Sequence, residues 1–201
     1  MPIETIALIG AGPLSRGIAC TALTGGYRLI LEDVLPERLA AALEEIRGWL
    51  DRALARGTCT AEQKDLCLAR LSTVSSADLA CREAYLVIET LPEEMETKID
   101  IFCIFEKFAR PGAILVTTAS SLSVTEIAAV TTRAPQCVGL RFLDRGQQRR
   151  VPLVQQEHGH VERARPAEVA VAVVNVPVVV LPERAVRAVR VVVAALWSVW
   201  L

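Results

Sequence analysis

Short apolar runs rich in β-branched residues alternate along the chain with longer stretches in which apolar positions recur every three or four residues. The short runs predict buried strands and the longer stretches predict amphipathic helices, an alternation typical of βαβ units with helices on a mostly parallel sheet. The predicted strands are residues 5–9, 28–32, 85–89, 114–117 and 137–142, and the predicted helices are residues 14–24, 36–56, 60–71, 94–108 and 124–130.

Two predicted helices follow each other directly and indicate a helical hairpin between the second and third strands. Pro36 suits the first turn of a helix, and Gly57 favours its end. Thr60 and Gln63 have the spacing of a capping box, which starts the second helix.

The residues after Asp144 differ in composition, because valine and arginine dominate and lysine is absent. We expect an Ala/Val-rich helix from about Pro166, a last strand over 176–181, and a terminal amphipathic helix or added strand over 185–201. The abrupt change also suggests a truncated or shifted reading of a longer gene.

The charge balance favours a small-molecule partner. The 201 residues are 52% hydrophobic, and 22 Lys and Arg face 23 Asp and Glu, giving a formal charge of -1. A globular chain without a broad basic field is not expected to bind nucleic acid.

The six cysteines contain no C-x-x-C pair, so we expect buried, reduced thiols rather than a zinc or redox site. The first residues lack the features of a signal peptide, which predicts a cytoplasmic protein. We expect no membrane span, because the apolar end of the chain is interrupted by Arg184, Arg187 and Arg190.

A glycine-rich segment follows the first predicted strand and matches the first two glycines of the dinucleotide fingerprint G-x-G-x-x-G. Gly10 permits a tight turn, and Gly12 lets a phosphate approach the backbone at the start of the following helix, which Pro13 and Leu14 open. Ser15 replaces the third glycine and is small enough to be tolerated. Gly10, Gly12, Pro13 and Leu14 are therefore predicted to bind the cofactor.

An acidic residue at the end of the second strand completes the nucleotide pattern. Asp33 has nearly the spacing of the acid that binds the adenosine ribose, and Glu32 is the alternative. A carboxylate there accepts hydrogen bonds from the ribose hydroxyls and repels a 2′-phosphate, which favours NAD over NADP.

Two further motifs, V-I-E-x-x-P-E at residues 87–93 and S-S-L-S-x-T-E-I-A at residues 120–128, resemble the NAD-binding domain of the L-3-hydroxyacyl-CoA dehydrogenase family. The resemblance covers about residues 3–155. It implies a doubly wound, Rossmann-type α/β fold with a helical hairpin insertion, NAD as cofactor, and oxidation of 3-hydroxyacyl-CoA to 3-ketoacyl-CoA. We expect one NAD-binding domain over 1–183 and an apolar segment over 184–201.

The resemblance also implies roles for single residues. Asp33 corresponds to the ribose acid, Thr90 and Glu93 line the nicotinamide-ribose side, Lys98 contacts the cofactor, and Ser120 binds substrate. The alternatives are an exposed Glu93–Lys98 pair on a helix and a helix-capping role for Ser120.

The catalytic pair departs from the family pattern. Arg141 stands where the family has its histidine base, and Gln155 stands where it has the orienting glutamate if residues 144–150 contain two extra positions. A permanently charged arginine cannot accept the hydroxyl proton, although it can polarise a keto oxygen or hold a carboxylate. His158 and His160 are expected in an exposed loop, and no metal site is expected.

The family's helical substrate domain is not recognised in these residues, so we expect a homo-oligomer or a separate helical domain as partner. Three functions remain open: an acyl-CoA oxidoreductase, an NAD-binding module without chemistry, and a hydroxyacid dehydrogenase in which Arg141 anchors the carboxylate.

Overall fold

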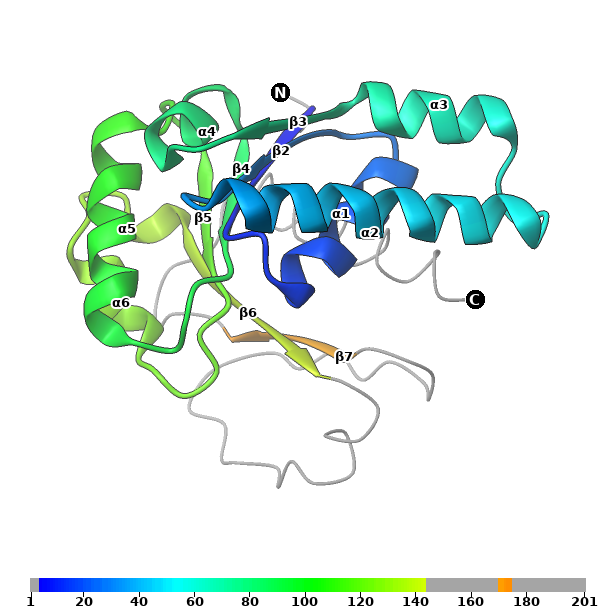
Figure 1. The fold of residues 1–201 in the computed structure, drawn as a ribbon. Helices are drawn as coiled ribbons and strands as arrows, with labels where there is room; N and C mark the ends of the chain where they lie inside the picture. The colour runs from blue at the N-terminus through cyan, green and yellow to red at the C-terminus, as the bar shows by residue number, and fades with distance from the viewer. Residues whose placement is uncertain (1–3, 144–169, 175–201) are drawn as a thin grey trace.

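The computed structural model describes the backbone of residues 4–143 and 170–174 and the side chains of residues 4–140. Within these residues a seven-stranded sheet has the order β3-β2-β1-β4-β5-β6-β7, in which β7 pairs antiparallel and the other strands are parallel (Figure 1). The strands are β1 (Thr5–Ile9), β2 (Arg28–Glu32), β3 (Leu71–Val74), β4 (Leu86–Glu89), β5 (Ile114–Thr117), β6 (Cys137–Leu143) and β7 (Ala170–Val174). The helices are α1 (Pro13–Thr24), α2 (Pro36–Ala55), α3 (Ala61–Ala69), α4 (Ala77–Glu83), α5 (Met95–Phe108), α6 (Val124–Ala129) and the 3-10 turn η1 (Ala134–Gln136).

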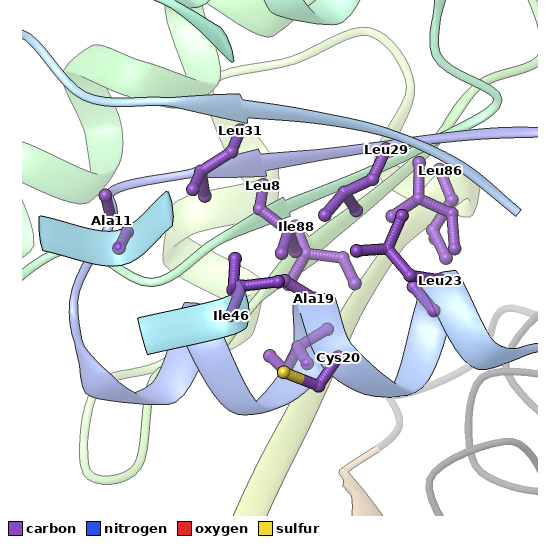
Figure 2. Close-up of a cluster of buried hydrophobic side chains, with 14 of the residues drawn as sticks. Leu8, Ala11, Ala19, Cys20, Leu23, Leu29, Leu31, Ile46, Leu86 and Ile88 are labelled. Carbon is purple, nitrogen blue, oxygen red and sulfur yellow. The ribbon is translucent and has the colours of Figure 1, made fainter. Parts of the chain in front are cut away.

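Helices cover both faces of the sheet, because successive strand residues point to opposite sides. In β1, Ile6 and Leu8 pack against α1 and α2, whereas Ala7 and Ile9 pack against α4, α5 and α6. Figure 2 shows the first of these layers, with leucines of β1 and β2 facing Ala19, Cys20 and Leu23 of α1. Continuous burial on both faces explains the uninterrupted apolar runs of the central strands.

The predicted hairpin is confirmed as α2 and α3, which run side by side (Figure 1). The capping box at its second helix is complete. Gln63 N–H donates to Thr60 Oγ1 over 3.1 Å, and Thr60 N–H donates to Gln63 Oε1 over 2.8 Å. These two bonds satisfy amide groups that would otherwise lack partners at the start of the helix.

Two expectations need correction, and two elements were missed. The helix predicted over 60–71 ends at Ala69, and the edge strand β3 and helix α4 were missed. The helix expected from about Pro166 is wrong at Ala170–Val174, where β-branched valines alternate with alanine and form β7. The strand expected over 176–181 and the segment 185–201 lie outside the described residues.

All six cysteines are free thiols, as expected. Four are buried, whereas Cys59 is half-buried and Cys103 is exposed. Burial raises the pKa of Cys20 to about 12 and that of Cys81 to about 11, which keeps both thiols protonated at neutral pH. No helix among the described residues is long and apolar enough to cross a membrane.

Candidate functional site

The strand order places the candidate site at the carboxyl end of β1. From β1 the chain proceeds outward through β2 and β3, and then returns to the other side of β1 to form β4, β5 and β6. The connections leaving β1 and β4 therefore diverge at the middle of the sheet. Open α/β sheets bind their ligands at such a reversal point.

The glycine loop between β1 and α1 has the geometry of a phosphate cradle. Gly10 adopts a φ of 92°, and a Cβ there would lie 3.1 Å from Thr90 Oγ1, so this position requires glycine. Gly12 caps α1, and a Cβ built on it would meet nothing within 4 Å. Pro13 begins the helix and Leu14 is 37% exposed beside it. The open space at Gly12 and the free amide groups of a helix N-terminus fit a pyrophosphate.

Ser15, the departure from the glycine fingerprint, fits without leaving its hydroxyl unpaired. Its side chain is fully buried, and its hydroxyl donates to the Gly10 carbonyl and shares a hydrogen bond with the Thr90 hydroxyl. Thr90 Oγ1 in turn lies 3.0 Å from the Ile9 carbonyl. Thr90 thus lies directly under the loop. Its contact with the nicotinamide ribose remains a prediction.

Asp33 lies beside the glycine loop. Its carboxylate is 5% exposed and accepts the Ala11 N–H at 2.9 Å and the Leu35 N–H at 3.0 Å. Glu32 is also buried, and burial, together with the charge of Asp33, raises its pKa to about 7 against the opposing hydrogen bond from Gly10. Asp33 is favoured over Glu32, because its carboxylate lies beside the glycine loop and an acid with a raised pKa is a poorer acceptor for ribose hydroxyls.

Lys98 and Glu89 form an ion pair in the interior. Both side chains are 0% exposed, and Lys98 Nζ lies 2.8 Å and 3.0 Å from the two oxygens of Glu89. The exposed Glu93–Lys98 pair is therefore wrong. A direct cofactor contact by Lys98 stays a prediction, but in this structure its ammonium also donates to the Leu91 carbonyl and is fully enclosed.

Glu89 is a buried residue of the candidate site that sequence reasoning did not single out. Besides Lys98, it accepts the Leu91 N–H at 2.9 Å, the Thr118 N–H at 3.2 Å and the Thr117 hydroxyl. It thereby joins the loop after β4 to the loop after β5. The available signal was a glutamate at the end of an otherwise apolar strand, where an unpaired charge would be costly.

Glu93 and Ser120, predicted separately, are brought together by the structure. Glu93 Oε1 accepts the backbone N–H groups of Ser120 and Ser121 at 2.7 Å each, both hydroxyls at 3.2 Å and 3.0 Å, and the Leu122 N–H at 3.3 Å. Partial burial raises the pKa of Glu93, but these bonds outweigh it and lower the pKa to about 2. The cap of α6 is Ser123, which accepts the Glu126 N–H, so the capping role of Ser120 is wrong.

The predicted catalytic residues are only partly described. Gly139 of β6 pairs with Thr117 of β5, so Arg141 lies two residues farther toward the edge that carries Ser120. Its backbone is paired with Ala172 of β7. The side chain of Arg141 lies outside the described residues, as do Gln155 and the two histidines.

Comparisons with known proteins agree with this arrangement. The family described as "3-hydroxyacyl-CoA dehydrogenase, NAD binding domain" matches residues 5–158. A probable 3-hydroxybutyryl-CoA dehydrogenase of Bacillus subtilis (strain 168) is 34% identical over 144 residues, which are 72% of this chain and 50% of that protein. A 3-hydroxyadipyl-CoA dehydrogenase of Escherichia coli (strain K12) is 34% identical over 142 residues, 71% of this chain and 30% of that protein.

Solved structures show the same fold. The crystal structure of 3-hydroxybutyryl-CoA dehydrogenase from Escherichia coli K12 aligns with a TM-score of 0.68 and 34% identity over 71% of this chain and 30% of that chain. The chain therefore spans half or less of the length of these relatives.

Proposed function

The chain belongs to the 3-hydroxyacyl-CoA dehydrogenase family through its NAD-binding domain, and we propose that it supplies the NAD-binding part of an oxidoreductase that interconverts 3-hydroxyacyl-CoA and 3-ketoacyl-CoA. NAD is the cofactor. The observation that carries the proposal is the Asp33 carboxylate, held 2.9 Å from the Ala11 N–H beside an open glycine loop.

Different residues at the carboxyl ends of the strands bind different parts of the dinucleotide. The backbone at Gly10 and Gly12 receives the pyrophosphate, and Asp33 accepts hydrogen bonds from the adenosine ribose. Thr90 and Glu93, after β4, line the side where the nicotinamide ribose lies. When bound, NAD would supply the acceptor for the hydride of the hydroxyl-bearing carbon, and NADH would supply the hydride for the reverse reaction.

Substrate contacts belong to the loop after β5 and to β6. The Ser120 hydroxyl, oriented by Glu93, binds the substrate oxygen. Arg141 polarises a keto oxygen but cannot remove a hydroxyl proton, because its guanidinium stays protonated. Gln155 cannot stabilise a protonated histidine by charge, so Arg141 and Gln155 do not replace the proton acceptor that the family's histidine provides.

Slow turnover is the first testable consequence. General acid–base catalysis contributes about 10²–10⁴-fold, so acetoacetyl-CoA reduction by this chain should fall far below the ~10 s⁻¹ that is common among enzymes. The double variant Arg141→His with Gln155→Glu should raise the rate, measured as acetoacetyl-CoA-dependent loss of NADH absorbance. A wild-type rate near ~10 s⁻¹ would contradict the assigned roles.

Two other functions make different predictions in the same assay. A nucleotide-binding module without chemistry would bind NADH but leave it unoxidised, with or without the double variant. A hydroxyacid dehydrogenase with Arg141 as carboxylate anchor would prefer acetoacetate to acetoacetyl-CoA. The family relationship favours the thioester substrate, because the relatives are named for acyl-CoA substrates.

We further propose that a helical partner completes the substrate site, either a separate domain or a second copy of the chain. The support is the apolar composition of residues 191–201. Light scattering should show association that is lost on deleting 191–201, and a monomer in both proteins would contradict the proposal.

Six free thiols are consistent with the proposed cytoplasmic location.

A further inference from the structure

A cation stands next to the predicted ribose acid. Arg38 lies in the first turn of α2, and its Nη1 atom is 3.9 Å from Asp33 Oδ2. That distance is too long for a hydrogen bond. The arginine side chain is 62% exposed, whereas that of Asp33 is 5% exposed. Among the described residues, no hydrogen bond holds this guanidinium.

A second arginine near the glycine loop, Arg16, already interacts with other groups of the protein. Arg16 Nε donates to the Ala11 carbonyl at 3.0 Å, and its Nη1 pairs with Glu45 at 2.5 Å. The carboxylate of Asp33 is likewise satisfied by two backbone N–H groups. Arg38 therefore forms a long ion pair with Asp33, and its N–H groups make no hydrogen bond within the described part of the chain.

We propose that Arg38 binds the 2′-phosphate of NADP(H) and thereby reduces the preference for NAD(H) that Asp33 imposes. This inference rests on the proposed position of the adenosine ribose at Asp33. A phosphate on the 2′-oxygen would lie close to both side chains. Asp33 repels it, and the planar guanidinium of Arg38 offers paired donors that suit phosphate oxygens.

The balance between the two residues follows from their exposure. The buried carboxylate is held by two backbone N–H groups and weakly screened, whereas the exposed guanidinium is screened by salt. Asp33 therefore prevails in the wild-type chain, which prefers NADH. Removal of Asp33 leaves Arg38 unopposed, and NADPH binding then depends on it.

The test is a set of fluorescence titrations with NADH and NADPH on the wild type, Arg38→Ala, Asp33→Ala and the double variant. Arg38→Ala should weaken NADPH binding by about threefold to fivefold and leave NADH within about twofold, as expected for one exposed charge. Asp33→Ala should lower the preference for NADH, and the double variant should lose the NADPH affinity that Asp33→Ala gains. Arg38→Lys should retain part of the NADPH affinity.

The matched control is Arg47→Ala, which removes an exposed charge from the same helix about 13 Å further along. It should leave both affinities unchanged. Equal NADPH affinity with and without Arg38, in a chain that binds NADH, would overturn this inference alone. Failure of the wild-type chain to bind NADH would overturn the proposed function and this inference with it.

Discussion

Glu89 and Glu93 are the two acids that hold together the loops after β4 and β5. Glu89 does so from the interior, through Lys98 and the backbone of Thr118. Glu93 does so at the surface, through the backbone of Ser120. Because Ser120 is the predicted substrate residue, both acids act as positioning groups for it.

Removal of the buried Lys98 ammonium should destabilise the folded chain. Lys98→Met leaves the Glu89 carboxylate buried without its counter-charge, which should reduce the free energy of unfolding by about 3–5 kcal/mol in urea denaturation. Lys107→Met, at an exposed position of the same helix where the ammonium lies 5.1 Å from the centre of the Phe108 ring, should stay within about 1 kcal/mol of the wild type. A loss below about 1 kcal/mol for Lys98→Met would show that the interior tolerates a lone carboxyl group.

Glu93 should make stability depend on acid pH. Its pKa is about 2 in the folded chain against 4.5 for an ordinary glutamate, so its contribution is present above about pH 4.5 and is lost as pH falls toward 2. Glu93→Gln should lower the free energy of unfolding by about 1 kcal/mol at pH 7, a modest value because the group is exposed. The difference should shrink by pH 3. A pH-independent difference, or the same profile for the exposed control Glu96→Gln, would argue against this role.

At the scale of elements, the buried strands and long helices were predictable because their apolar periods are unambiguous. The strand β1 followed from its apolar run, and the glycine loop followed from Gly10 and Gly12. The edge strand β3 was missed because Ser72 and Thr73 are exposed and interrupt the apolar run. Sequence spacing also cannot reveal that Glu89, rather than Glu93, is the partner of Lys98, since that contact depends on how α5 packs against β4.

The contact between α1 and the loop after β4 should depend on the Ser15 hydroxyl. Ser15→Ala removes the hydrogen bonds to the Gly10 carbonyl and Thr90 hydroxyl, and should reduce the free energy of unfolding by about 1 kcal/mol in chemical denaturation. Ser15→Gly restores the glycine fingerprint but should reduce the free energy of unfolding by about 1 kcal/mol more than Ser15→Ala does, because glycine disfavours the helix. If Ser15→Gly is more stable than the wild type, the hydroxyl has no such role.

For the whole molecule, the candidate site combines residues from β1, β2, β4 and β5 at one edge of the sheet. The cofactor side of this site was predictable, because it depends on short motifs with fixed spacing. The substrate side of the site was less predictable. Its residues include Arg141 and Gln155, and in the relatives it also involves parts that this chain does not span.

The central claim is that the chain binds NAD at the reversal point of the sheet through Asp33 and the glycine loop. Calorimetric titration with NADH tests it most directly, on the wild type, Asp33→Ala, Gly12→Val and the control Gly48→Ala. We predict saturable binding to the wild type and Gly48→Ala, weakened binding to Asp33→Ala, and none to Gly12→Val despite an unchanged thermal midpoint, because a side chain there fills the space of the pyrophosphate. Equal NADH affinity in all four proteins, or none in the wild type, would contradict the account.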